Sequence, residues 1–129
     1  MRRTSLKSVR SGKGLALACA REAAEKKADD ILVLDMRAIS SIADYFVICS
    51  GSSTRQVKAI AESIVEEARG GGARCSHSEG WQDSYWIVLD FTDVIVHVFH
   101  TDARQYYRIE RLWGDAKTVT RQKPNAEGT

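Results

Sequence analysis

The chain has 129 residues, of which 43% are hydrophobic and 28% charged, as in an ordinary globular protein with one buried core. Nineteen basic and seventeen acidic residues leave a net charge of +2, which does not favour nucleic acid or an anionic membrane as the main partner. No apolar run reaches the roughly 20 residues of a membrane span. Three cysteines without a CxxC spacing argue against a disulfide framework, so we expect a reducing compartment, by default the cytoplasm.

The first half of the chain predicts a helix followed by two strands. Residues 1–13 are basic and lack periodicity, so we expect a flexible basic N-terminal tail. The Ala-rich stretch 14–27 has high helix propensity. The apolar runs 30–36 and 45–50 are nearly continuous, which is typical of strands in a sheet that is covered on both faces.

A second helix is the clearest element in the sequence. Apolar residues recur at helical spacing from Val57 to Ala68 and give the helix one apolar face. Ser53 as N-cap and Gln56 three residues later form a capping box. The glycines at 70–72 suit a left-handed C-cap, so the helix is expected to end there.

The second half predicts three more strands. Residues 73–79 are polar and indicate a strand near a sheet edge. The runs 86–91 and 93–99 are separated by a short turn near Thr92, which predicts an antiparallel hairpin. Asp102 is then expected to cap a last helix.

These elements predict one α/β domain over residues 14–117, with a mixed, roughly five-stranded sheet and flanking helices. Residues 118–129 contain the only proline and are interpreted as a flexible C-terminal tail. The order of elements contains no internal repeat.

The histidines do not predict a metal site. Alternation along a strand puts His97 on the face of its apolar neighbours and His100 on the other, so the two cannot easily hold one ion. We interpret His97 as a packed, hydrogen-bonded residue. Cys75 and His77 share a strand face, but zinc needs three or four ligands. We therefore expect no metal and no cofactor.

The Gly51-Ser52 turn resembles the strand-Gly-Ser-helix opening of nucleotidyltransferases. That chemistry requires paired carboxylates on a following strand to hold a divalent metal, and the chain contains no Asp-x-Asp. A nucleotide-binding enzyme that takes its acidic residues from Asp35 or Asp90 is one alternative function. An RNA-binding protein that uses the basic N-terminal tail is another.

The polar loop 79–86 is the strongest candidate for a contact surface, because it carries two tryptophans and a tyrosine. Trp86 begins a strand, where core packing accounts for it. Trp81 lies in the loop itself, where it either packs the loop or anchors an interface, since tryptophan is enriched at binding hot spots. Asp83 beside it suits a basic partner.

Several spaced motifs together resemble the ribosomal silencing factor family, also called RsfS or Iojap-like, over roughly residues 16–116. In chain order they are SSIADYFVI, SGSS with QV-x-AIA, WIVLD, DVIVHVF and R-x-YY-x-IE-x-LW-x-DA. The chain departs from the family at Thr92, where a glycine is usual.

The resemblance implies a non-catalytic factor that binds the large ribosomal subunit through ribosomal protein fourteen. Bound there, it would block association with the small subunit and repress translation under nutrient limitation, with a further role in large-subunit biogenesis. It also implies a nucleotidyltransferase-like fold without catalytic carboxylates, dimers of the free protein, and neither a membrane nor a small-molecule substrate. For the contact we expect Trp81, Asp83, Ser84 and Trp86 first, and Asp93, His97, Arg104 and Tyr107 second.

Overall fold

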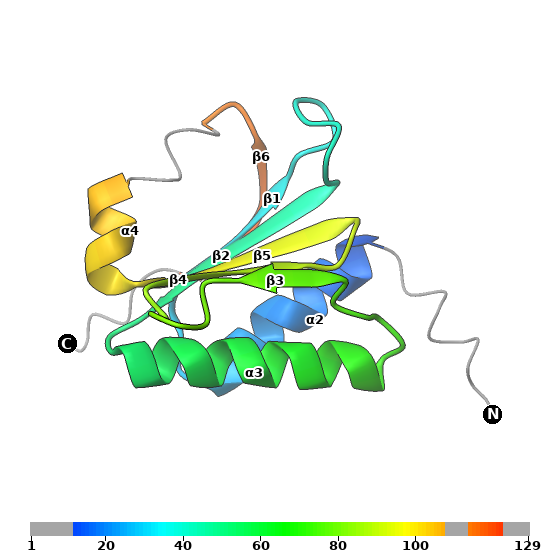
Figure 1. Cartoon of the computed structure of the whole chain (residues 1–129). Helices are drawn as coiled ribbons and strands as arrows, with labels where there is room; N and C mark the ends of the chain where they lie inside the picture. Colours follow the sequence, from blue (N-terminus) through cyan, green and yellow to red (C-terminus); the bar gives the residue numbers. More distant parts are fainter. Residues whose placement is uncertain (1–11, 108–113, 123–129) are drawn as a thin grey trace.

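The structure, a computed structural model, describes residues 12–107 and 114–122. Figure 1 shows a twisted sheet with two long helices against one face and a short helix on the other. In chain order the elements are α2 (Gly12–Glu25), β1 (Asp29–Asp35), β2 (Tyr45–Gly51), α3 (Thr54–Gly70), β3 (His77–Glu79), β4 (Trp86–Asp90), β5 (Val94–His100), α4 (Thr101–Tyr107) and β6 (Lys117–Gln122).

The sheet has the strand order β3-β4-β5-β2-β1-β6. Only the central β2 and β5 pair in parallel, and all other neighbours are antiparallel. The predicted single α/β domain with a mixed sheet and flanking helices is confirmed. The predicted strand count is wrong, because the sheet has six strands rather than roughly five.

The sixth strand lies mostly within the segment that was expected to be a flexible C-terminal tail. β6 has one partly buried residue, Val119, and its other five residues are exposed. An edge strand of this kind is held by backbone pairing with β1 and carries almost no hydrophobic signal in its sequence. The expectations for residues 1–11 and 123–129 lie outside the described residues.

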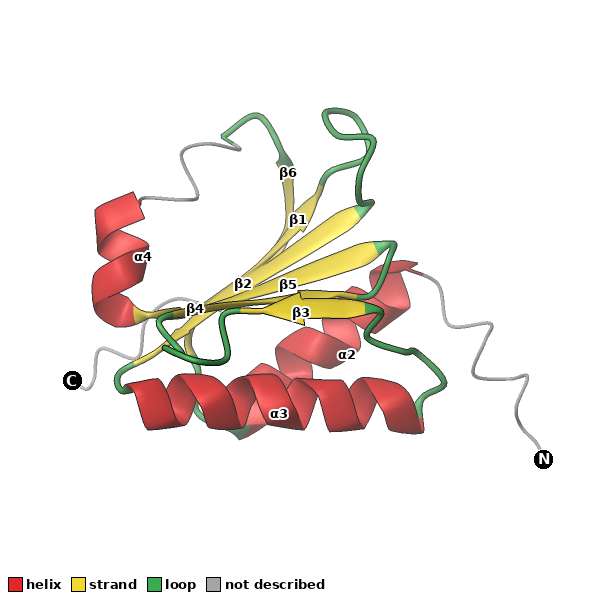
Figure 2. Ribbon diagram, in the orientation of Figure 1, coloured by secondary structure: helices red, strands yellow, loops and turns green. Residues whose placement is uncertain are grey.

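Apolar side chains form one buried cluster on each face of the sheet. α2 and α3 cover one face of the sheet (Figure 2), and their buried residues pack with inward residues of the strands such as Val47 and Val96. A smaller cluster on the opposite face includes Phe46, Ile48 and Phe99. β2 lies in the middle and is buried along its whole length, which explains its continuous apolar run.

The capping residues of α3 act nearly as predicted. Ser53 Oγ accepts the backbone N–H of Gln56 at 3.1 Å, and Gln56 Oε1 accepts the backbone N–H of Ser52 at 2.7 Å. The amide of Gln56 also donates to the carbonyl of Lys27 at 3.0 Å and so ties the turn to the end of α2. The helix ends at Gly70, and Gly72 adopts φ +91.

The β4–β5 hairpin is confirmed, and its turn places Thr92 at φ 80. A β-branched residue is strained in this left-handed region, and glycine is the residue that adopts it freely. The turn is held by the backbone N–H of Thr92, which donates to Asp90 Oδ1 at 2.7 Å. α4 begins at Thr101, so Asp102 lies in its first turn rather than at its N-cap.

Candidate functional site

The predicted contact residues do not form one surface, because Trp81 and Trp86 lie on opposite sides of the sheet. Trp86 packs against the apolar cluster on the face opposite α2 and α3. Trp81 packs against the cluster under the two helices. Along β4 the side chains alternate, so Ile87 and Leu89 face the helices while Trp86 and Val88 face away from them.

An aromatic and aliphatic surface, which we call the Trp86 face, lies on β4 and β5. It consists of Trp86, Val88 and Ile95, all half-buried, over the buried rings of His97 and Phe99. The strand register opposes Trp86 to Phe99 and Val88 to His97, which puts these pairs on the same side. The Trp86 and Phe99 rings stack with centroids 4.8 Å apart. Val88 and Ile95 were missed by the sequence analysis, although the alternation in WIVLD places Val88 beside Trp86.

His97 is the packed and hydrogen-bonded residue that was predicted. Its Nδ1 accepts the indole N–H of Trp86 at 3.2 Å, and its ring lies 4.8 Å from that of Phe46. Burial lowers the pKa of His97 to about 4. The imidazole is therefore neutral at pH 7, and because an indole can only donate, its proton sits on Nε2. His97 is only 6% exposed and holds the Trp86 ring in place through this hydrogen bond.

Polar side chains border the Trp86 face. Glu79 lies opposite Val88, and His77 lies opposite Asp90, across the β3–β4 pair. The Nε2 atom of His77 is 2.8 Å from Oε2 of Glu79. The predicted contact residue Asp93 is exposed in the β4–β5 turn, but its Cβ lies 3.6 Å from the place of a Cβ on Gly12, so it faces the start of α2 and not the Trp86 face. Glu79 and Asp90 are the carboxylates that border the face along β3 and β4.

Like His97, two further predicted contact residues are internal. Ser84 is 5% exposed, and its hydroxyl donates to the carbonyl of Trp81 at 2.9 Å. Arg104 is 6% exposed and forms an ion pair with Asp30 at 3.3 Å, so its guanidinium anchors α4 to β1 instead of lying on the surface. Asp83 is exposed in the loop beside Trp81. The side chain of Tyr107, at the end of α4, lies outside the described residues.

The sheet register separates Gly51 from Asp35 and Asp90, the two carboxylates of the nucleotide-binding alternative. Gly51 ends β2 and pairs with His100, whereas Asp35 pairs with Tyr45 at the start of β2. Asp90 lies at that same far end of the sheet. A seven-residue strand separates the two ends by about 20 Å, so neither carboxylate reaches Gly51.

Other reactive arrangements are also missing from the part of the chain that the structure describes. No group of three or more His, Cys, Asp or Glu there is placed to hold a metal ion. Burial raises the pKa of the Cys49 thiol to about 12, so this cysteine is not a thiolate at neutral pH. None of the described helices is long and apolar enough to span a membrane.

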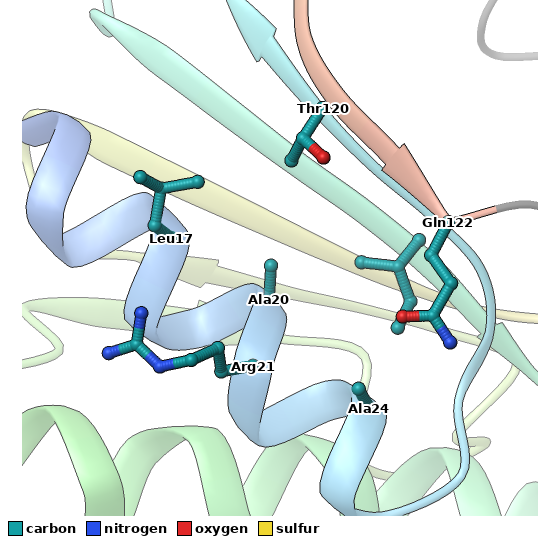
Figure 3. A pocket seen from close by; sticks show the side chains of 7 residues that line it. Leu17, Ala20, Arg21, Ala24, Thr120 and Gln122 are labelled. Atoms are coloured by element: carbon teal, nitrogen blue, oxygen red, sulfur yellow. The ribbon is translucent and has the colours of Figure 1, made fainter.

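A hollow of about 270 Å³ lies between α2 and the edge of the sheet (Figure 3). It is lined by small and aliphatic residues of α2 and by Thr120 and Gln122 of β6. The guanidinium of Arg21 points away from Thr120 and Gln122 in this view. The hollow therefore has no converging polar groups that would orient a ligand.

The chain is similar to known proteins along most of its length. A family model described as "Ribosomal silencing factor during starvation" matches residues 9–129. The ribosomal silencing factor RsfS of Bacillus subtilis is 51% identical over 92 residues, which cover 71% of this chain and 78% of that protein.

Two solved structures share the fold. A crystal structure of a protein from Chromobacterium violaceum superposes with a TM-score of 0.79 at 33% identity, covering 81% of this chain and 87% of that one. Another, from Bacillus halodurans, gives 0.74 at 38% identity and covers 84% and 98%.

Proposed function

Because the chain belongs to the ribosomal silencing factor family, we propose that it represses translation by binding the large ribosomal subunit through ribosomal protein fourteen. The bound domain occupies space that the small subunit must enter, so the two subunits do not associate. The mechanism is steric, and no covalent bond is made or broken. A contact of ordinary size, about 800 Å² on each partner, suffices for it.

The Trp86 face is the observation that carries this proposal. It combines a tryptophan anchor with aliphatic neighbours at the centre and polar groups around them, which is the usual anatomy of a protein–protein contact. The carboxylates of Glu79 and Asp90 at its border complement a basic protein surface. The same carboxylates repel phosphate, so the face favours a ribosomal protein over bare ribosomal RNA.

The chemistry of the chain supports a binding role over an enzymatic one. The glycine turn after β2 is filled by the side chain of Gln56, which accepts from the Ser52 amide that an anionic ligand would otherwise use. The candidate carboxylates lie at the other end of the sheet. These features support the absence of a nucleotide site at this turn.

Val88→Lys tests the contact more cleanly than removal of Trp86, whose ring also stacks on Phe99 and bonds to His97. The variant puts a charge at the centre of the Trp86 face, and we expect its affinity for isolated large subunits to fall at least about tenfold. Gly70→Lys is the matched control, because this residue at the end of α3 has open space around it. Co-sedimentation with large subunits and titration of purified ribosomal protein fourteen measure both variants.

Two outcomes contradict the proposed contact. In one, the folded Val88→Lys protein sediments with large subunits as well as the unmodified protein does. In the other, Gly70→Lys loses as much affinity as Val88→Lys, which would point to net charge rather than to the Trp86 face.

A further inference from the structure

A second candidate surface lies on the helix side of the sheet, away from the Trp86 face. The loop between β3 and β4 lies beside α3 (Figure 2), and the two enclose a hollow of about 390 Å³. Its walls are Trp81 from the loop and Glu62, Val65 and Glu66 from α3. We call this hollow the Trp81 groove.

The loop holds Trp81 in place by contacts that do not depend on a partner. Gly80 has φ +92, and a Cβ there would meet the carbonyl oxygen of Trp86 at 2.0 Å, so only glycine fits. The backbone N–H of Ser84 closes the turn onto the carbonyl of Gly80 at 2.9 Å. The indole N–H of Trp81 donates to Ser78 Oγ at 2.7 Å. The ring is thus fixed before any partner arrives, which lowers the entropic cost of binding.

Two carboxylates, those of Glu62 and Glu66, line the groove beside the ring. Glu62 and Glu66 are four residues apart on α3 and therefore project from the same side of the helix. Glu66 also forms an ion pair with Arg69 at 3.1 Å, and both of these side chains are largely exposed. Such an exposed pair contributes little and exchanges readily with a competing cation. Asp83 adds an exposed carboxylate to the same loop.

An aromatic ring beside two carboxylates is the arrangement that receives a guanidinium group. Arginine stacks on tryptophan through its planar group and forms paired hydrogen bonds with carboxylates, whereas phosphate is repelled by them. We propose that the Trp81 groove binds an arginine side chain of a basic polypeptide partner. Because the groove and the Trp86 face lie on opposite sides of the sheet, both can be occupied at once.

NMR of the indole N–H groups tests this directly, since the chain has three tryptophans and the Trp81 signal is the one that Trp81→Phe removes. The probe is a blocked Gly-Gly-Arg-Gly-Gly peptide, and the same peptide with citrulline in place of arginine keeps the shape without the charge. We expect a saturable shift of the Trp81 signal with the arginine peptide at millimolar concentration and no saturable shift with the citrulline peptide.

Variants of α3 test whether the carboxylates of the groove bind the arginine peptide. The double variant Glu62→Gln with Glu66→Gln is expected to weaken binding of the arginine peptide roughly three- to tenfold. Glu67→Gln removes one charge from an exposed position of α3 outside the groove, and we expect it to bind as the unmodified protein does.

The proposal is overturned if the Trp81 signal does not move, moves equally with citrulline, or responds equally in the Glu62/Glu66 and Glu67 variants. A Trp81 signal that shifts with protein concentration would mean that a second copy fills the groove. A signal that shifts on deletion of residues 1–11, without peptide, would assign the groove to this chain's own basic segment. Either result also overturns the proposal. None of these outcomes bears on the Trp86 face, which Val88→Lys tests separately.

Discussion

The imidazole of His97 shows how a single residue's chemistry follows from its surroundings. Strand alternation was enough to predict that it packs with apolar neighbours, and the structure adds the indole of Trp86 as its hydrogen-bond donor. The sequence did not indicate this partner, because Trp86 lies on another strand and the pairing depends on hairpin register. Burial keeps the ring neutral.

His97 makes the stability of the fold depend on pH. Its pKa is about 4 in the folded protein against 6.5 ordinarily, so between these values the unfolded chain binds more protons. The free energy of unfolding is therefore highest above pH 6.5. It falls by about 3 kcal/mol as the pH is lowered to about 4.

Urea unfolding of the unmodified protein and of His97→Gln across this range measures the effect. Glutamine is neutral throughout and can still accept from the indole, so we expect its stability to fall less steeply with acid. Equal slopes for the two proteins between pH 4 and 6.5 would refute this role of His97.

At the scale of elements, the carboxylate of Asp30 connects β1 with α4 and β6. Asp30 at the start of β1 forms ion pairs with Arg104 of α4 at 3.3 Å and with Arg121 of β6 at 3.0 Å. Both partners lie more than seventy positions further along the chain, so no local pattern in the sequence indicated either pair. The arginine from α4 is buried, while that from β6 is 41% exposed.

Asp30→Asn is expected to destabilise the fold by roughly 3–5 kcal/mol, because it leaves the buried charge of Arg104 without its carboxylate. Asparagine tolerates the positive φ of 45 at this position, so the backbone should not add to the cost. Arg121→Ala removes only the exposed pair and should cost less than about 1 kcal/mol. Urea unfolding measures both variants. Similar decreases in the free energy of unfolding would contradict the claim that the buried pair stabilises the fold more than the exposed pair.

How well an element could be predicted depended on how much apolar surface it buries. α3 has a continuous apolar face and side-chain caps, and the sequence indicated both of its ends. β6 buries almost nothing, so its sequence was indistinguishable from that of a tail. A polar strand was predicted over residues 73–79, but β3 spans only His77–Glu79. The reason is similar, since β3 forms an edge of the sheet and pairs only with β4.

On the scale of the whole molecule, the domain presents two separate surfaces. Trp81 and Trp86 are five residues apart, and the sequence alone predicts that both belong to one contact. The turn at Gly80–Ser84 folds one ring against α3 and leaves the other on the opposite face of the sheet. The fold class and the family followed from motifs along the chain, but the side on which a loop residue lies depends on tertiary packing.

Subunit joining in the presence of the protein is the measurement that tests the central claim most directly. Purified protein is incubated with isolated large subunits, small subunits are added, and the mixture is separated on a sucrose gradient. We predict that joined ribosomes are lost, that the protein travels with the large subunit alone, and that Val88→Lys restores joining while Gly70→Lys does not. Normal joining with the unmodified protein bound to the large subunit would contradict steric silencing. Normal joining with the protein at the top of the gradient would contradict ribosome binding itself.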